Sequence, residues 1–276
     1  MSHRGILRAV SAGILGAIFA AALFAGEVTH YSYAMQFREL PNAGPSALHL
    51  LGTDGLGRDL FARLIYGTRV SLLLAPAAAL MTTLIAGVFG SFAGLVGGWS
   101  ERLILAAADL SMALPLLFVL LALRSVLPLD ISPVLSVVAT FILLGLLGWP
   151  SSLRVLWATS RNFRNSDFLL LAHATGCGRW RMIRRHVLPN LRPVLFAQFW
   201  ISIPLFVLTE ATLSMLGLGV MEPLPSWGNL LRGLEDFSAV STNPWRLSPL
   251  ILLVLVVICF QLILPAQEEI ACLCVP

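Results

Sequence analysis

The sequence predicts an all-α membrane protein with six transmembrane helices, and three observations lead to this prediction. Of the 276 residues, 58% are hydrophobic and only 12% are charged, which is too little charge for the surface of a soluble globule. The apolar residues form six stretches of roughly 20 residues, long enough to cross a bilayer as helices. The arginines cluster between these stretches, as they do beside membrane spans.

Polar segments that contain proline and glycine separate the six predicted spans. We expect the spans at about residues 9–26, 70–96, 103–127, 133–156, 194–219 and 247–264. The polar segments lie at about residues 27–67, 160–192 and 220–246. The first span follows Arg4 and Arg8 and therefore also fits a cleaved signal peptide, but nothing after it reads as a secreted domain. We treat residues 1–276 as a single transmembrane domain.

The distribution of charge predicts the orientation of the chain. Residues 154–192 contain eight arginines and a single acid, Asp167, whereas residues 220–246 contain two arginines and three acids. The positive-inside rule therefore places residues 160–192 in the cytoplasm. Counting crossings from there places both termini in the cytoplasm and residues 27–67 and 220–246 outside.

Several classes of function are excluded by residue types that the chain lacks. All eighteen basic residues are arginine, which excludes a lysine-containing phosphate-binding loop, a Schiff-base lysine and a kinase-type lysine. No predicted span contains a histidine, which excludes a serine protease within the membrane. The spacing of cysteines and histidines fits no metal site. The arginines do not follow a soluble face, so we expect no binding of nucleic acid.

The basic segment of residues 167–190 predicts two short helices on the cytoplasmic side. Asp167 can cap a helix that starts at Phe168, and Gly176 can supply the left-handed residue that ends it. A second, amphipathic helix follows until Pro189 breaks the pattern. Two compact helices held at the membrane predict a docking element for a soluble partner. The alternative is a basic loop that contacts anionic lipid.

Two acidic residues lie inside predicted spans, Asp109 in the third and Glu210 in the fifth. An unpaired charge near the bilayer centre costs about 2.5–3.5 kcal/mol on insertion scales. Both side chains are therefore expected to face protein or water. A structural hydrogen bond between helices and a role along a transport pathway both fit, and the sequence leaves both open.

Three motifs occur in order within residues 51–249. They read GTDGLGRDLFARLIYGTRVSL from Gly52, LLLAHATGCGRWRMIRRHVLP from Leu169, and EATLSMLGLGVMEPLPSWG from Glu210. Their order and spacing resemble the permease subunits of ABC importers, in the dipeptide, oligopeptide and nickel class and the subunit type called C. The second motif differs from the family pattern at its acidic position and first alanine, which are Leu170 and Leu171.

The resemblance implies roles for three groups of residues. Coupling to an ATPase is implied for Asp167, Phe168, Leu170, Leu171, Ala172, Gly176, Arg181, His186, Leu188 and Pro189. A structural role at the outer mouth, with ligand contact as the alternative for residues 52–69, is expected for Gly52, Asp54, Gly57, Arg58, Asp59, Arg69, Trp227 and Gly228. The intramembrane polar positions Asp109 and Glu210 also resemble family positions.

The resemblance also implies a function and partners. It implies six helices of the ABC importer permease type in a bacterial cytoplasmic membrane, with peptides as cargo and nickel or another small solute left open. The partners would be a homologous permease subunit, two ATPase subunits and an extracytoplasmic solute-binding protein. The chain itself would be no enzyme and would hold no metal or cofactor, because ATP and Mg would bind to the ATPases. The alternatives are a membrane scaffold without transport, or an ion-coupled carrier that uses Asp109 and Glu210.

Overall fold

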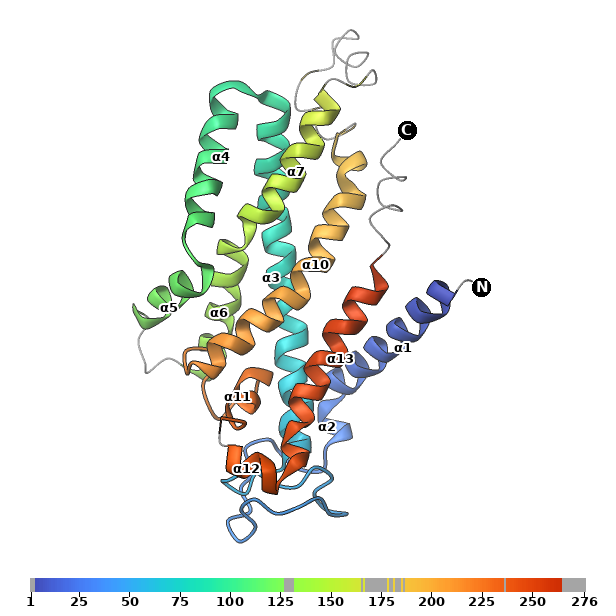
Figure 1. Cartoon of the computed structure of the whole chain (residues 1–276), viewed down its shortest axis with the longest axis vertical. Helices are drawn as coiled ribbons and strands as arrows, with labels where there is room; N and C mark the ends of the chain where they lie inside the picture. Colours follow the sequence, from blue (N-terminus) through green and yellow to red (C-terminus); the bar gives the residue numbers. More distant parts are fainter. Residues whose placement is uncertain are drawn as a thin grey trace. The chain divides into compact units, whose positions relative to one another are not determined.

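The computed structural model describes residues 3–126, 132–164, 187–235 and 237–264, together with the single residues 166, 178, 181 and 185. Within these residues the chain is helical, and its β-structure is limited to isolated bridges between Gln36 and Arg58 and between Thr53 and Asp59. The prediction of an all-α protein is confirmed. In chain order (Figure 1) the helices are α1 (His3–Leu23), α2 (Ala25–Val28), α3 (Leu60–Val96), α4 (Gly98–Ala113), α5 (Leu116–Val126), α6 (Pro133–Leu147), α7 (Trp149–Arg164), α10 (Leu188–Met215), α11 (Trp227–Arg232), α12 (Phe237–Thr242), the 3-10 helix η2 (Pro244–Leu247) and α13 (Ser248–Ile263).

Each of the six predicted spans has a helical counterpart in the described part of the chain. Five stretches are long and apolar enough to cross a membrane: Gly5–Leu23, Leu60–Val96, Pro133–Arg164, Leu188–Met215 and Pro244–Ile263. The sixth counterpart is the pair α4 and α5, which passes the same test together. Length and composition therefore support six spans only if this pair counts as one.

The third span was predicted as one continuous helix, and this prediction is wrong. The axes of α4 and α5 differ by 82°, and the helix ends at Leu114, whose backbone is extended with φ −91° and ψ 126°. Pro115 follows directly. Proline disfavours a helical conformation in the residue before it and has no N–H for the helical ladder, so it explains the break.

The second span begins at Leu60, well before the predicted start at residue 70. Asp59 caps this helix: its Oδ2 accepts a hydrogen bond from the backbone N–H of Ala62 at 2.7 Å. Residues 60–67, which the sequence assigned to a polar segment, are therefore helical. An aspartate before an apolar run is a typical helix start, and this signal was available in the sequence.

The predicted boundaries around residues 160–192 are also wrong. Helix α7 continues to Arg164 instead of ending near residue 156, and α10 begins at Leu188 instead of near residue 194. Pro189 lies in the first turn of α10, and the amphipathic helix predicted before it falls mostly outside the described residues. A proline is tolerated there because the N–H groups of the first turn have no partner within the helix.

The described residues form two compact units, and the prediction of a single domain stays a prediction. Unit 1 contains the chain up to Pro76 together with Leu121–Phe141 and Pro204–Ile263. In this unit α1 lies beside α13, as Figure 1 shows, and α11 also packs on α13. Its largest fully buried apolar side chains include Leu72, Phe206, Leu213 and Trp227.

Unit 2 contains Ala77–Leu120 and Ile142–Ile203, and in it α4 packs along α7. Its apolar core comprises Ala86, Ala108, Leu153, Leu156, Val187, Leu191 and Val194. Glycines of α3 allow α7 to approach closely: a Cβ at Gly94 would lie 2.7 Å from Cβ of Ser160 and 2.8 Å from the carbonyl oxygen of Trp157. One side of α7 is thus packed tightly within this chain.

Candidate functional site

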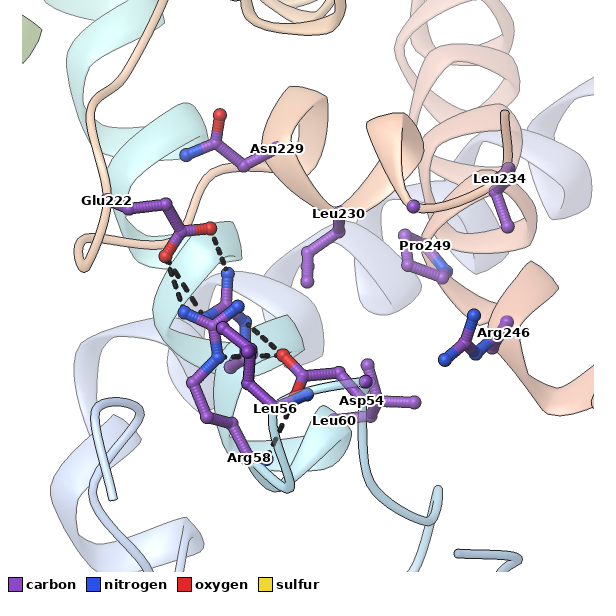
Figure 2. Close-up of a pocket in the computed structure, with 13 residues that line it drawn as sticks. Asp54, Leu56, Arg58, Leu60, Glu222, Asn229, Leu230, Leu234, Arg246 and Pro249 are labelled. Carbon is purple, nitrogen blue, oxygen red and sulfur yellow. Dashed lines mark hydrogen bonds and ion pairs between the residues drawn. The ribbon is translucent and has the colours of Figure 1, made fainter. Parts of the chain in front are cut away.

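Four charged side chains from distant parts of the sequence meet in unit 1, and we call them the four-charge cluster: Asp54, Arg58, Arg63 and Glu222. Arg58 donates from Nε to Oδ2 of Asp54 and from Nη1 to Oε2 of Glu222, both at 2.7 Å. Arg63 donates from Nη2 to Oε1 of Glu222 at 2.7 Å, and its Nε lies 3.8 Å from Oδ2 of Asp54. The dashed lines in Figure 2 mark these contacts.

The cluster joins two loops to the start of a helix. Arg63 lies in the first turns of α3, Asp54 and Arg58 lie in the loop before it, and Glu222 lies between α10 and α11. The side chain of Arg63 is only 2% exposed, whereas that of Glu222 is 49% exposed. Because both arginines contact Glu222, this one carboxylate holds the two loops together.

Two glycines shape the loop before α3. Gly52 and Gly57 adopt φ of +69° and +73°, a region that residues with a side chain rarely occupy. A Cβ at Gly57 would lie 2.7 Å from the carbonyl carbon of Phe37, so the space is closed as well. Between them, Oδ1 of Asp54 accepts the N–H groups of Leu56 and Arg58 at 2.9 Å each. The loop is therefore built by local turns.

Asp59 also has a second partner that the sequence did not predict. Nδ1 of His49 lies 2.9 Å from Oδ1 of Asp59, and both side chains are buried. His49 in turn packs against the rings of Tyr31 and Phe37. No local spacing in the sequence links His49 to Asp59, so this pairing was not predicted.

The four-charge cluster forms one wall of a pocket of about 390 Å³. Asn229, Leu230, Arg246 and Pro249 are among the other lining residues. Figure 2 shows Arg246 and Pro249 lying apart from the cluster. Arg246 donates from Nη2 to the side-chain oxygen of Asn42. The pocket thus presents charges of both signs together with apolar surface.

Glu210 is fully buried in a group that we call the serine–glutamate network: Ser71, Glu210, Ser214 and Ser226. Ser214 donates to Oε1 of Glu210 at 2.6 Å, and Ser71 donates to Oε2 at 3.3 Å. Ser226 donates to the hydroxyl of Ser214 at 3.4 Å. Ser226 also caps α11 by accepting the N–H of Asn229 at 3.3 Å. The network links α3, α10 and α11.

Trp227 and Gly228 fix α11 against the same helices. Trp227 is completely buried, and its Nε1 donates to the hydroxyl of Thr68 on α3 at 2.9 Å. A Cβ at Gly228 would lie 2.7 Å from the carbonyl oxygen and 2.8 Å from Cα of Ala211 on α10. Any side chain at this position would therefore push α11 away from α10.

Asp109 on α4 forms an ion pair with Arg154 on α7 in unit 2. The two side chains are 54% and 50% exposed within this chain. The sequence predicted that Asp109 faces protein or water, and the ion pair supplies one protein partner.

Arg124 on α5 is a buried polar residue that the sequence analysis missed. It donates from Nε to the carbonyl oxygen of Leu218 at 3.0 Å and from Nη2 to that of Gly219 at 3.2 Å. A further bond from Nη2 goes to the hydroxyl of Ser136. These carbonyls follow the end of α10, where Gly217 adopts a φ of +79°. A lone arginine in an apolar stretch was the available signal.

Most of the predicted docking element lies outside the described residues, namely Asp167, Phe168, Leu170, Leu171, Ala172, Gly176 and His186. Arg181 is described and exposed, and Leu188 and Pro189 open α10. Arg69, predicted at the outer mouth, lies exposed on α3. The roles predicted for all these residues stay predictions, as does the expectation that the chain holds no metal or cofactor.

Residues 86–268 match the family described as binding-protein-dependent transport system inner membrane component. The matched region includes the second and third sequence motifs.

Several curated proteins are similar to the chain. A Brucella suis protein provisionally named as a peptide permease is 35% identical over 205 residues, which cover 74% of this chain and 66% of that protein. The chain thus spans just under two thirds of the length of this relative. From Bacillus subtilis, the oligopeptide transport system permease protein OppC is 31% identical over 85% of this chain and 74% of its own length. The dipeptide transport system permease protein DppC is 31% identical over 85% and 71%.

Proposed function

The chain belongs to the family of binding-protein-dependent transport system inner membrane components, and from this we propose that it is the permease subunit of an ATP-driven ABC importer for peptides. The observation that carries the proposal is the family match over residues 86–268 in a chain whose described part has five helical stretches apolar enough to cross a membrane, or six if α4 and α5 count as one span. Peptides are proposed as the cargo because the relatives named above are described as peptide, oligopeptide and dipeptide permeases. Nickel or another small solute is the alternative cargo.

In the proposed assembly this chain forms half of the translocation pathway. A homologous permease subunit forms the other half, two ATPase subunits bind on the cytoplasmic side, and an extracytoplasmic binding protein delivers the solute. ATP and Mg bind to the ATPases, and this chain performs no covalent chemistry. The eight arginines of residues 154–192 support placing this segment and both termini in the cytoplasm.

The proposed mechanism is alternating access driven from the cytoplasmic side. Closure of the ATPases moves the segment from Phe168 to Gly176, which shifts the spans from an inward-open to an outward-open arrangement. Such a shift requires that ATP binding stabilises one arrangement more than the other. Release of the hydrolysis products reverses the shift and delivers the solute to the cytoplasm.

The two rival functions have less support. An ion-coupled carrier would use Asp109 and Glu210 as ion-binding groups, but Glu210 is fully buried and bonded to two serines. A membrane scaffold without transport would not explain why the chain matches a family of transport components.

Purification of the tagged chain from its native membrane in mild detergent, followed by mass spectrometry, tests the assembly. We expect two P-loop ATPases and a second permease to be recovered with it. Recovery of the chain alone, from membranes in which other ABC importers stay intact, would contradict the proposal.

The coupling role of the segment that ends at Gly176 has its own test. Gly176→Ala should lower the uptake per ATP hydrolysed in reconstituted vesicles, because alanine disfavours the left-handed conformation predicted there. Gly178→Ala is the neighbouring control. Normal uptake and normal coupling in Gly176→Ala would refute this role.

A further inference from the structure

One face of α7 is exposed and polar. Six of its seven exposed positions, all except the terminal Arg164, fall on a single side of the helix: Ser151, Arg154, Val155, Ala158, Arg161 and Asn162. The opposite side carries the buried residues Leu153, Leu156 and Ser160. We call the exposed side the α7 polar face. The ion pair between Arg154 and Asp109 of α4 belongs to it.

This face differs from the exposed positions of other spans. On α10 the exposed residues include Phe196 and Leu205, and on α13 they include Ile251 and Ile258. Large apolar side chains suit contact with lipid tails. The α7 polar face has only one large apolar residue, Val155. It therefore does not suit contact with lipid tails.

The charges on this face lie far from the ends of their helices. Arg154 precedes the last residue of α7 by ten residues, about 15 Å along the helix axis. Asp109 lies at a similar depth, eleven residues after Gly98 at the start of α4. Long arginine side chains near span ends can extend to the surface, but an aspartate is too short to do so. Lipid on this face would leave a half-exposed ion pair in hydrocarbon.

We propose that the α7 polar face lines the aqueous route of the solute, and that Arg154 binds the carboxylate of the passing peptide in exchange for Asp109. This inference rests on the proposed function, in which some face of the chain borders a translocation pathway. The face carries two arginines, Arg154 and Arg161, against one acid, Asp109. Its excess positive charge favours a solute with a carboxylate.

The ion pair explains how such a site can release its solute. A guanidinium with no internal partner would hold a carboxylate tightly in a site of low dielectric. Asp109 competes for the same guanidinium, so that the solute exchanges with it instead of being trapped. A conduction site has to bind its solute weakly enough for the solute to leave.

The first test measures access of water to the face in the whole transporter. The four native cysteines, Cys177, Cys259, Cys272 and Cys274, are first replaced. Single cysteines then take the place of Ser151 or Ala158, and Phe196→Cys is the matched control, because Phe196 is apolar and 61% exposed in the same unit. A charged methanethiosulfonate reagent should modify Ser151→Cys and Ala158→Cys at least about tenfold faster than Phe196→Cys, because it reacts only where water reaches.

Two results of the labelling would overturn the proposal. One is equal and slow modification at all three positions, which would indicate lipid on the face. The other is protection of Ser151→Cys and Ala158→Cys together with cross-linking to the second permease, which would indicate a protein interface. Small residues also occur where membrane helices pack together, so this second result is a real alternative.

The second test measures recognition of the carboxylate. Uptake of the synthetic peptide trialanine is compared with that of its C-terminal amide, in vesicles that contain the complete assembly with its binding protein. Arg154→Gln should raise the KM for trialanine about tenfold and leave the amide nearly unchanged. Arg154→Lys should restore most of the loss. Any preference of the binding protein for one of the two peptides is the same in the parent and the variant assembly, so it does not affect the comparison between them.

An equal effect of Arg154→Gln on both peptides would indicate a structural role and would overturn the carboxylate site. Asp109→Asn keeps the proposal testable if Arg154→Gln fails to assemble: it frees Arg154 and should lower the KM for trialanine alone. If the unaltered assembly transports neither peptide, the proposed peptide cargo fails, and the labelling still decides whether the face lines an aqueous route.

Discussion

The two acidic side chains within the apolar spans, Glu210 and Asp109, have opposite surroundings. Glu210 is fully buried, and hydroxyls of its own chain donate to both of its oxygens. Asp109 pairs with Arg154 and is more than half exposed. In the sequence the two residues were equivalent, because each was a lone acid in an apolar stretch.

Glu210 therefore stabilises the fold of its own chain, whereas the ion pair of Asp109 and Arg154 stays open to whatever surrounds the chain. The partners of Glu210, Ser71 of α3 and Ser214 of α10, come from its own unit, so its place in the fold is complete without another molecule. In the ion pair of Asp109 and Arg154 each charge has a partner of opposite sign, but about half of each side chain stays exposed. A charge pair left open in a span needs water or protein on its other side.

The largest effect that we expect distinguishes the two acids by stability. Glu210→Ala should lower the free energy of unfolding by about 3 kcal/mol or more, because it leaves a cavity and two buried hydroxyls without their acceptor. Asp109→Ala should lower it by less than about 1 kcal/mol, as for other exposed ion pairs. Denaturant-induced unfolding in detergent measures both. Similar losses would show that burial does not separate the two acids.

A smaller effect concerns the packed side of α7, opposite the α7 polar face. Gly94→Ala should cost about 2 kcal/mol, because the added Cβ meets backbone atoms of α7 that cannot move aside freely. In the control Gly13→Ala, the added Cβ meets nothing within 4 Å, and stability should stay level or rise by up to about 1 kcal/mol. The same unfolding experiment applies. A Gly94→Ala chain as stable as the parent would mean that α7 is not held tightly against α3.

The smallest effect tests the hydrogen bonding beside Glu210. Trp227→Phe should cost about 1 kcal/mol, because it removes the donor to Thr68 from a buried site. Trp245→Phe is the matched control, since Nε1 of Trp245 has no hydrogen-bond partner in the part of the chain that the structure describes. A loss in Trp245→Phe as large as in Trp227→Phe would show that ring packing, and not the hydrogen bond, matters at Trp227.

Features that depend on local composition were predictable from the sequence. The all-α class and the number of apolar stretches follow from composition and length alone. Gly52 and Gly57 were assigned a structural role, and both have the positive φ that tight turns need. The bend at Pro115 was also readable in principle, because the effect of proline on its preceding residue is local.

Pairings across the chain were not predictable. Glu222 was not among the predicted site residues, although it binds Arg58 and Arg63 from a position some 160 residues away. Arg124 was missed because its acceptors are backbone carbonyls, which any sequence provides. The open face of α7 was hidden because periodicity shows that a helix has two sides but does not show which side its own chain covers.

The length of α3 has a consequence for where the four-charge cluster stands. Its 37 residues give α3 a length of about 56 Å. The hydrocarbon layer is about 30 Å thick, and a helix tilted by 40° would cross it in about 39 Å. The helix is thus about 17 Å longer than such a tilted crossing needs. The charged residues Arg63 and Arg69 lie towards its N-terminal end, so the surplus length belongs there. The four-charge cluster therefore stands on the part of α3 that a crossing of the lipid does not require.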